Sequence, residues 1–139
     1  MSRADRFTPE AKRLEYYSDF MTNFNFHPLT GDIAKITNEN SVKTAVKKLL
    51  LTNIGEVAYE PNYGSKLYSL LFELPTQQTS VIISEEIRTA IENFEPRIDL
   101  IDIRVKPSFD QNAYEITVTF SIINSVENIS LDLILRRVR

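Results

Sequence analysis

The stretch that decides the fold is residues 114–135, which read YEITVTFSIINSVENISLDLIL. Apolar and polar residues alternate along it on both sides of a turn-rich segment, residues 124–128. A period of two residues is typical of strands with one buried and one wet face. The alternation also occurs in residues 100–105, and residues 107–112 are again rich in turn formers. In that earlier stretch Ile101, Ile103 and Val105, expected on the buried face, alternate with Leu100, Asp102 and Arg104. The sequence therefore predicts three consecutive strands in an antiparallel meander.

Before the strands the hydrophobic period is 3.6 residues, as in amphipathic helices. Apolar residues within residues 42–50 predict a helix whose cap is Asn38 or Asn40. A second apolar stripe predicts a helix over residues 76–94, which ends before Pro96 because proline disfavours helical geometry in the residue that precedes it. Two long helices are therefore expected to cover one face of the meander.

The connection between these helices is expected to be a loop or a short hairpin over residues 52–63. Gly64 can adopt a positive φ angle after it, and Ser65 can cap a short helix over residues 66–73. The predicted fold class is therefore α+β, with a three-stranded antiparallel meander at the C-terminus packed on two or three helices.

The first thirty residues differ from the rest because aromatic side chains are concentrated there. Thr8 as a cap and Pro9 at the first helical position predict a helix over residues 9–21. This aromatic helical arm either packs on its own domain or docks on a partner, and the sequence leaves both possibilities open. The predicted division is an arm of residues 1–30 and a domain of residues 31–139.

The composition excludes several classes of function. The 139 residues include no Cys and one His, His27, so the chain lacks the residues for disulfides, Cys-based zinc sites and catalytic triads. We expect no metal and no cofactor. A net charge of −3 and a pI near 5.2 disfavour binding to nucleic acid or to an anionic membrane. The apolar runs are far shorter than the roughly 20 residues that span a bilayer, and no signal peptide is visible, so we expect synthesis in the cytoplasm.

A pair of carboxylates acting on a glycosidic bond is the one enzymatic option for which the chain has enough residues. The candidates are Glu56, Glu60, Glu73 and Glu95. Nothing in their spacing places two of them at the separation of about 5 to 9.5 Å that the mechanism requires. A function without catalysis is therefore favoured.

The end of the second long helix carries an unusual charge pattern. Glu92 and Glu95 lie in its last turn, where the negative end of the helix dipole favours cations instead. Arg97, which follows Pro96, could offset these charges within the chain. Alternatively, the corner fixed by the proline could present the arginine fork to a carboxylate on another protein. The sequence leaves both interpretations open.

The last predicted strand is the other candidate site. As the final element it is expected at an edge of the sheet, where unpaired backbone groups form a template for strand addition. Ile134 on its outer face would add apolar contact, whereas Arg136, Arg137 and Arg139 are charges that proteins also use to protect an edge. The residues assigned to this candidate are Ile129, Leu131, Leu133, Ile134, Leu135, Arg136 and Arg137.

Four short motifs occur in a fixed order along the chain. They are IGEV at residues 54–57, PNYGS at residues 61–65, LLFE at residues 70–73 and EPRID at residues 95–99, followed by the alternating strands. Their order and spacing resemble those of the gene-25-like baseplate wedge proteins of contractile phage tails, from about residue 32 to the end. The residues of the loop motif are Gly55, Glu56, Pro61, Tyr63, Gly64 and Ser65.

This resemblance implies structural work in the tail baseplate of a virion. It implies that Glu95, Pro96 and Arg97 attach the chain to the helical core bundle of the wedge, and that the last strand accepts extended arms of the sheath protein and so starts sheath assembly. Other wedge proteins, the tail sheath protein and proteins near the tail tube are the implied partners. The type VI secretion subunit TssE and related contractile-injection proteins share the fold, so an equivalent subunit of such a machine is the alternative. The family also carries a lysozyme label, for which this sequence offers no convincing acid pair.

Overall fold

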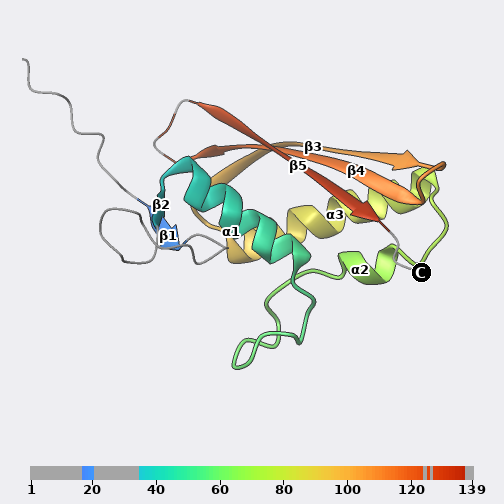
Figure 1. Ribbon diagram of the computed structural model, residues 1–139, viewed down its shortest axis with the longest axis horizontal. Helices are drawn as coiled ribbons and strands as arrows, with labels where there is room; N and C mark the ends of the chain where they lie inside the picture. Colours follow the sequence, from blue (N-terminus) through green and yellow to red (C-terminus); the bar gives the residue numbers. More distant parts are fainter. Residues whose placement is uncertain (1–16, 21–34, 124, 126, 137–139) are drawn as a thin grey trace, which may run out of the picture.

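The computed structural model describes residues 17–20, 35–123, 125 and 127–136. Within these ranges a three-stranded sheet lies on a layer of helices, which confirms the predicted α+β class (Figure 1). In chain order the elements are β1 (Ser18–Phe20), β2 (Lys35–Thr37), α1 (Glu39–Leu51), α2 (Leu67–Leu70), α3 (Gln77–Phe94), β3 (Ile98–Ser108), β4 (Ala113–Ile122) and β5 (Asn128–Arg136).

The sheet is the predicted antiparallel meander, with β4 between β3 and β5. Near one end of the sheet, Leu100, Phe120 and Ile129 are aligned across the three strands. Both α1 and α3 lie against the same face (Figure 1). Because β4 has a neighbour on each side and the helices below, its inward residues are the most completely buried of the sheet. The core cluster that joins the two layers includes Val42, Val46, Leu50, Ile83, Ile87, Ile91, Ile116, Val118, Phe120, Leu133 and Leu135.

The prediction for β3 was wrong at one position, Ile101. The pairing of β3 with β4 shifts by one residue between Leu100 and Asp102, so Ile101 has no partner across the ladder and is half exposed. An inserted residue reverses the alternation, because successive side chains point to opposite faces. The inward residues are therefore Leu100 before the bulge and Ile103 and Val105 after it.

The two long helices agree with their predicted ranges. Thr76 caps α3, and its side-chain oxygen accepts a hydrogen bond from the Thr79 backbone N–H at 3.2 Å. Asn38 occupies the cap position of α1, but its side chain makes no capping hydrogen bond. None of the helices in the described ranges is long and apolar enough to cross a membrane.

The short helix is shorter than predicted, because α2 covers only Leu67–Leu70 of the expected residues 66–73. The cap position is Lys66 and not the predicted Ser65, although the Ser65 hydroxyl accepts a long hydrogen bond from the Leu67 backbone N–H at 3.5 Å. The Ser65 hydroxyl also donates to the Leu50 carbonyl oxygen at 2.8 Å, and the Ser65 backbone N–H donates to the Thr52 carbonyl oxygen at 2.9 Å. Ser65 therefore closes the base of the preceding loop.

The predicted helix over residues 9–21 is wrong for Ser18–Phe20, which form strand β1 and pair antiparallel with β2. The backbone N–H of Asn38 also donates to the Tyr17 carbonyl oxygen at 2.7 Å. Pairing with β2 supplies hydrogen-bond partners for the backbone N–H and C=O groups of β1. The apolar stripe in the sequence does not indicate this pairing. The remainder of that predicted helix lies outside the described residues, and the division at residue 30 stays a prediction.

Gly64 supports a prediction about the base of the loop. Its φ angle is +121°, and a Cβ atom there would lie 2.6 Å from the Thr52 carbonyl oxygen. Gly64→Ala should therefore lower the free energy of unfolding by at least about 2 kcal/mol, measured by urea denaturation. Gly55 is the matched control, because its φ of +86° is also positive but nothing lies within 4 Å of the added Cβ. Gly55→Ala should cost only about 1 kcal/mol, and equal losses would contradict the proposed backbone clash.

Candidate functional site

The connection from α3 to β3 consists of Glu95, Pro96 and Arg97. Glu95 is the C-terminal cap of the helix, and its backbone N–H still donates to the Ile91 carbonyl oxygen at 2.9 Å. Pro96 prevents a further helical turn, since it disfavours the α conformation at the residue before it. The chain reverses within these three residues, here called the corner, and enters the sheet as β3.

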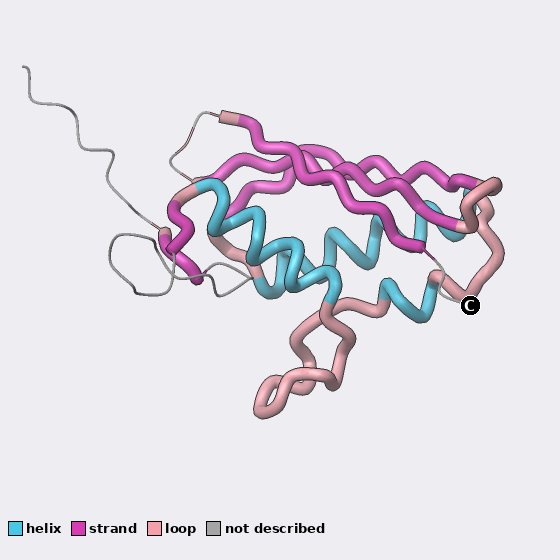
Figure 2. Tube along the Cα trace, viewed as in Figure 1, coloured by secondary structure: helices cyan, strands magenta, loops and turns pink. Residues whose placement is uncertain are grey.

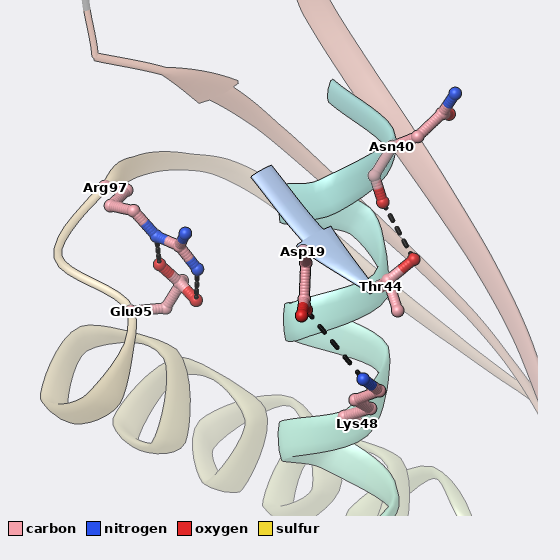
Figure 3. A network of polar contacts seen from close by, with 6 residues as sticks. All are labelled: Asp19, Asn40, Thr44, Lys48, Glu95 and Arg97. Atoms are coloured by element: carbon pink, nitrogen blue, oxygen red, sulfur yellow. Dashed lines mark hydrogen bonds and ion pairs between the residues drawn. The ribbon is translucent and has the colours of Figure 1, made fainter. Parts of the chain in front are cut away.

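A two-pronged ion pair holds the corner (Figure 3). The Arg97 Nε and Nη2 atoms donate to the two carboxylate oxygens of Glu95 at 2.5 and 2.7 Å. The Glu95 side chain is 6% exposed, whereas that of Arg97 is 33% exposed. The hydrogen bonds to Glu95 raise the pKa of the Arg97 guanidinium above its ordinary value, although burial opposes the shift. The charge of Glu95 at the helix end is therefore offset within the chain, as one of the two interpretations of the sequence required.

Part of the Arg97 fork remains available. A guanidinium has five N–H donors, of which Glu95 takes two. Within the described ranges no hydrogen bond joins the Nη1 atom to another residue. Intrachain pairing and contact with a partner protein are therefore compatible, because they use different edges of the same group.

The segment before β2 also lies at the corner. The Arg97 Cζ atom is 5.4 Å from the centre of the Tyr17 ring, a cation–π distance. Asp19 forms an ion pair with Lys48 of α1 at 3.8 Å (Figure 3). The second contact contributes little on its own, since both side chains are partly exposed. Together the cation–π contact and the ion pair hold residues 17–20 against the corner and α1.

The loop motif reaches the corner through Tyr63. The Tyr63 and Phe94 rings meet edge to face, with centres 5.3 Å apart. Burial raises the pKa of the Tyr63 phenol, the nearby charges of Glu95 and Glu60 raise it further, and Arg97 lowers it. The contact between Tyr63 and Phe94 thus joins the loop motif to the end of α3, directly before the corner.

The remaining loop-motif residues shape the loop itself. Gly55 donates its backbone N–H to the Pro61 carbonyl oxygen at 2.9 Å, and Glu56 accepts a hydrogen bond from the Asn53 backbone N–H at 2.9 Å. Gly64 and Ser65 close its base, as described above. These hydrogen bonds hold the local backbone, so the motif positions a loop.

The last strand, β5, lies at an edge of the sheet, as predicted. Within the described residues no strand pairs with its outer side. The side chains of Ile129, Leu133 and Leu135 are buried in the core and Leu131 is half buried, so these four residues could offer a partner only their backbone. Ile134 and Arg136 are exposed on the outer face, whereas Arg137 lies outside the described residues.

The two edges of the sheet differ in regularity. Strand β5 pairs with β4 over nine residues without a register shift. At the other edge β3 carries the bulge at Ile101, includes Pro107, and forms an exposed ion pair between Asp102 and Arg104. Bulges, prolines and charges are the features that prevent pairing at an edge. The β5 edge is therefore the better template for an added strand.

Two of the acids considered for catalysis are held by hydrogen bonds within the chain. Both carboxylate oxygens of Glu95 accept hydrogen bonds from Arg97, and Glu56 bonds to the backbone of its own loop. Glu73 lies in the connection between α2 and the start of α3, whereas Glu95 caps the end of α3. In the part of the chain that the structure describes, no cluster of three or more His, Asp or Glu side chains could hold a metal ion.

Sequence reasoning missed two contacts of the corner. They are the Tyr17 ring against the Arg97 guanidinium and, beside it, the ion pair of Lys48 with Asp19. Local spacing holds no signal for either, because Tyr17 and Arg97 are far apart in the chain. Lysines and acidic residues on different segments are so common that the sequence does not indicate which of them pair.

The sequence profile of the family described as baseplate wedge protein gp25 matches residues 37–127. The chain belongs to this family. The baseplate wedge protein gp25 of Enterobacteria phage T4 is 30% identical over 98 residues, which are 70% of this chain and 74% of that protein. The chain is thus a member of the gp25 family of baseplate wedge proteins.

Two solved structures share the fold of this gp25-family chain. One, from Geobacter sulfurreducens, is provisionally described as a tail lysozyme; it has a TM-score of 0.66 and 20% identity, over 73% of this chain and 92% of that one. The other belongs to the baseplate of the anti-feeding prophage, with a TM-score of 0.62 and 19% identity, over 86% of this chain and 85% of that one. At these identities the likeness concerns the fold alone, so the lysozyme description carries no activity over to this chain.

The ion pair of the corner supports a second prediction. Arg97→Ala leaves a buried carboxylate without its partner and should lower the free energy of unfolding by about 1 to 3 kcal/mol. Adding Glu95→Gln should recover part of this loss, so a double-mutant cycle by urea denaturation should give a coupling energy above about 1 kcal/mol.

The pair Asp102–Arg104 is a matched control, with the same two-residue spacing and an Nε–Oδ2 distance of 2.8 Å but largely exposed side chains. Its cycle of Asp102→Asn and Arg104→Ala should give a coupling energy below about 0.5 kcal/mol. Equal coupling energies for the two pairs would contradict the stabilising role assigned to the buried one.

Proposed function

We propose that this chain is a non-enzymatic subunit of a phage tail baseplate, without cofactor, that anchors to the helical core of the wedge through its corner and starts sheath polymerisation by strand addition at β5. One observation carries the proposal: the β5 edge pairs with β4 without a register shift, whereas the β3 edge on the opposite side of the sheet is protected by a bulge, a proline and charges. Family membership supports the setting, and the geometry of the described residues supports the two contacts. The virion baseplate is the proposed location.

The β5 edge suits an extended arm from a sheath subunit. Along its nine residues every second backbone N–H and C=O group points away from β4, because consecutive groups of an antiparallel strand point to opposite sides. Each hydrogen bond to an arm contributes only about 1 kcal/mol net. Several bonds per arm, repeated around a ring of subunits, would make the junction firm through multivalency. Ile134 would add apolar contact on the outer face.

The corner suits a helical partner. Glu95 fixes one edge of the Arg97 guanidinium, so the opposite edge is already oriented when a partner arrives. Its N–H groups match a side-chain carboxylate or the free carbonyl groups at a helix C-terminus. Pro96 is exposed beside it and fixes the backbone of the corner. Proteins near the tail tube are further proposed neighbours of the assembled subunit.

Amide hydrogen exchange tests strand addition at β5. In the free chain alternate amides of β5 should exchange quickly, and adding the purified sheath protein of the same particle should slow those amides at least tenfold. The fast amides of the β3 edge are the internal control and should stay fast, because the bulge and Pro107 disfavour pairing there. Slowing at β3 instead, or slow exchange of all β5 amides in the free chain, would refute the proposal.

A conservative variant tests the corner. Arg97→Lys keeps a cation beside Glu95 but loses the planar fork, so the chain should stay folded while its copurification with the other wedge proteins falls at least tenfold. Arg104→Lys changes a similarly paired arginine away from the corner and should copurify like the wild type. Thermal melting of both variants separates loss of folding from loss of binding, and full copurification of Arg97→Lys would remove the anchoring role.

A further inference from the structure

The loop over residues 53–63, here called the knob, projects away from both layers of the fold. Figure 2 shows it standing clear of α1 and α2, the two helices that it connects. Residues 53–62 are all exposed, so this part of the loop contributes little burial to the fold. Burial in the core therefore does not explain why the loop has a defined shape.

The knob is held by an internal set of hydrogen bonds. The Gly55 and Pro61 backbones join its two sides, and the Tyr63 backbone N–H donates to the Glu60 carbonyl oxygen at 3.1 Å. The Glu56 carboxylate holds the Asn53 backbone N–H, and the ring of Tyr63 fixes the base against Phe94. The knob is thus a built projection with a defined backbone.

Tyr59 lies in this projection with its side chain fully exposed and a φ angle of +71°. The left-handed region is unfavourable for a residue with a large side chain, and such backbone outliers cluster at binding sites. An exposed ring makes no contact that offsets this cost in the isolated chain. A tyrosine held in this way is however well suited to a binding contact, since tyrosine is enriched among the residues that dominate interface energies.

The surroundings of Tyr59 define the chemistry of a partner. Ile54 and Val57 are exposed on the same loop, so the knob presents apolar surface around the ring. The charged residues of residues 53–63 are Glu56 and Glu60, both acidic. Because Glu56 is engaged with the Asn53 backbone, Glu60 is the acid that remains for a partner. An acidic projection disfavours nucleic acid and anionic lipid and favours a protein surface with basic side chains.

We infer that the knob is a third docking element of the subunit, whose Tyr59 ring enters an apolar socket on another baseplate protein while a Lys or Arg at the rim of the socket pairs with Glu60. The inference rests on the proposed function only in taking the partner from the same assembly. The knob uses neither the free edge of Arg97 nor the backbone of β5. An experiment can therefore refute docking by the knob without refuting the proposed contacts of the corner and of β5.

Substitutions separate binding from folding at this position. Tyr59→Asn removes the ring but tolerates a positive φ angle, so the isolated chain should melt no lower than the wild type while its incorporation into particles falls at least tenfold. Glu60→Lys should reduce incorporation as well. Phe72→Ala removes another exposed aromatic side chain outside the knob and should leave incorporation unchanged. Wild-type incorporation of Tyr59→Asn overturns the inference.

Photo-crosslinking identifies the partner within assembled particles. A photoreactive phenylalanine analogue at position 59 should crosslink to a peptide of a different baseplate protein that contains Lys or Arg. The same analogue at the exposed Asn93, next to the corner, reports on the proposed anchor. Crosslinks from position 93 with none from position 59, or with position 59 crosslinked only to a second copy of this chain, nucleic acid or lipid, would overturn the knob and leave the anchor standing. No crosslink from either position would count against both.

Discussion

The burial of one face of β4 against α1 and α3 is the interaction on which the rest of the structure depends. Ile116, Val118 and Phe120 are fully buried between the two layers. Burying a side chain of this size contributes roughly 1.5 to 3 kcal/mol before entropy is counted. With β4 fixed on the helices, β3 and β5 become the two edges of the sheet. The helices thus determine which face of the sheet is closed, and within the described residues the outer sides of β3 and β5 have no strand partner.

The same packing places the corner. Because α3 lies under β3, the chain must reverse within three residues, and this reversal brings an acidic helix cap next to an arginine. The ion pair offsets the unfavourable position of Glu95 at the negative end of the helix. Tyr17 and Tyr63 meet the same corner from two other segments of the chain. The corner is therefore a junction of helix, sheet, loop and N-terminal segment.

Much of the fold follows from local patterns in the sequence. The alternation in residues 114–135 is sufficient to predict β4 and β5, because the register between these two strands is continuous. The period of 3.6 residues likewise predicts α1 and α3. The bulge at Ile101 has no local signal, since an apolar residue in an alternating run is expected to be buried. The strand Ser18–Phe20 depends on pairing with residues 35–37, and three residues are too few to show a period.

The candidate site was less predictable because it depends on contacts between distant segments. The motif at residues 95–97 indicates a corner, but only the structure shows that Glu95 takes one edge of Arg97 and leaves the other. The edge position of β5 follows from its place in the chain, whereas the contrast with β3 depends on the bulge. The left-handed backbone of Tyr59 could not be predicted from the sequence either. The loop motif includes Gly55 and Gly64, where a positive φ angle is expected, but not Tyr59.

The central claim is that β5 is an open template for a strand from a neighbouring protein. Electron cryo-microscopy of the assembled particle, at a resolution that traces the backbone, tests this most directly. The account predicts an extended segment of a sheath subunit beside β5, at the ladder spacing of about 4.8 Å. A map in which solvent or residues of the same chain occupy that position would contradict it.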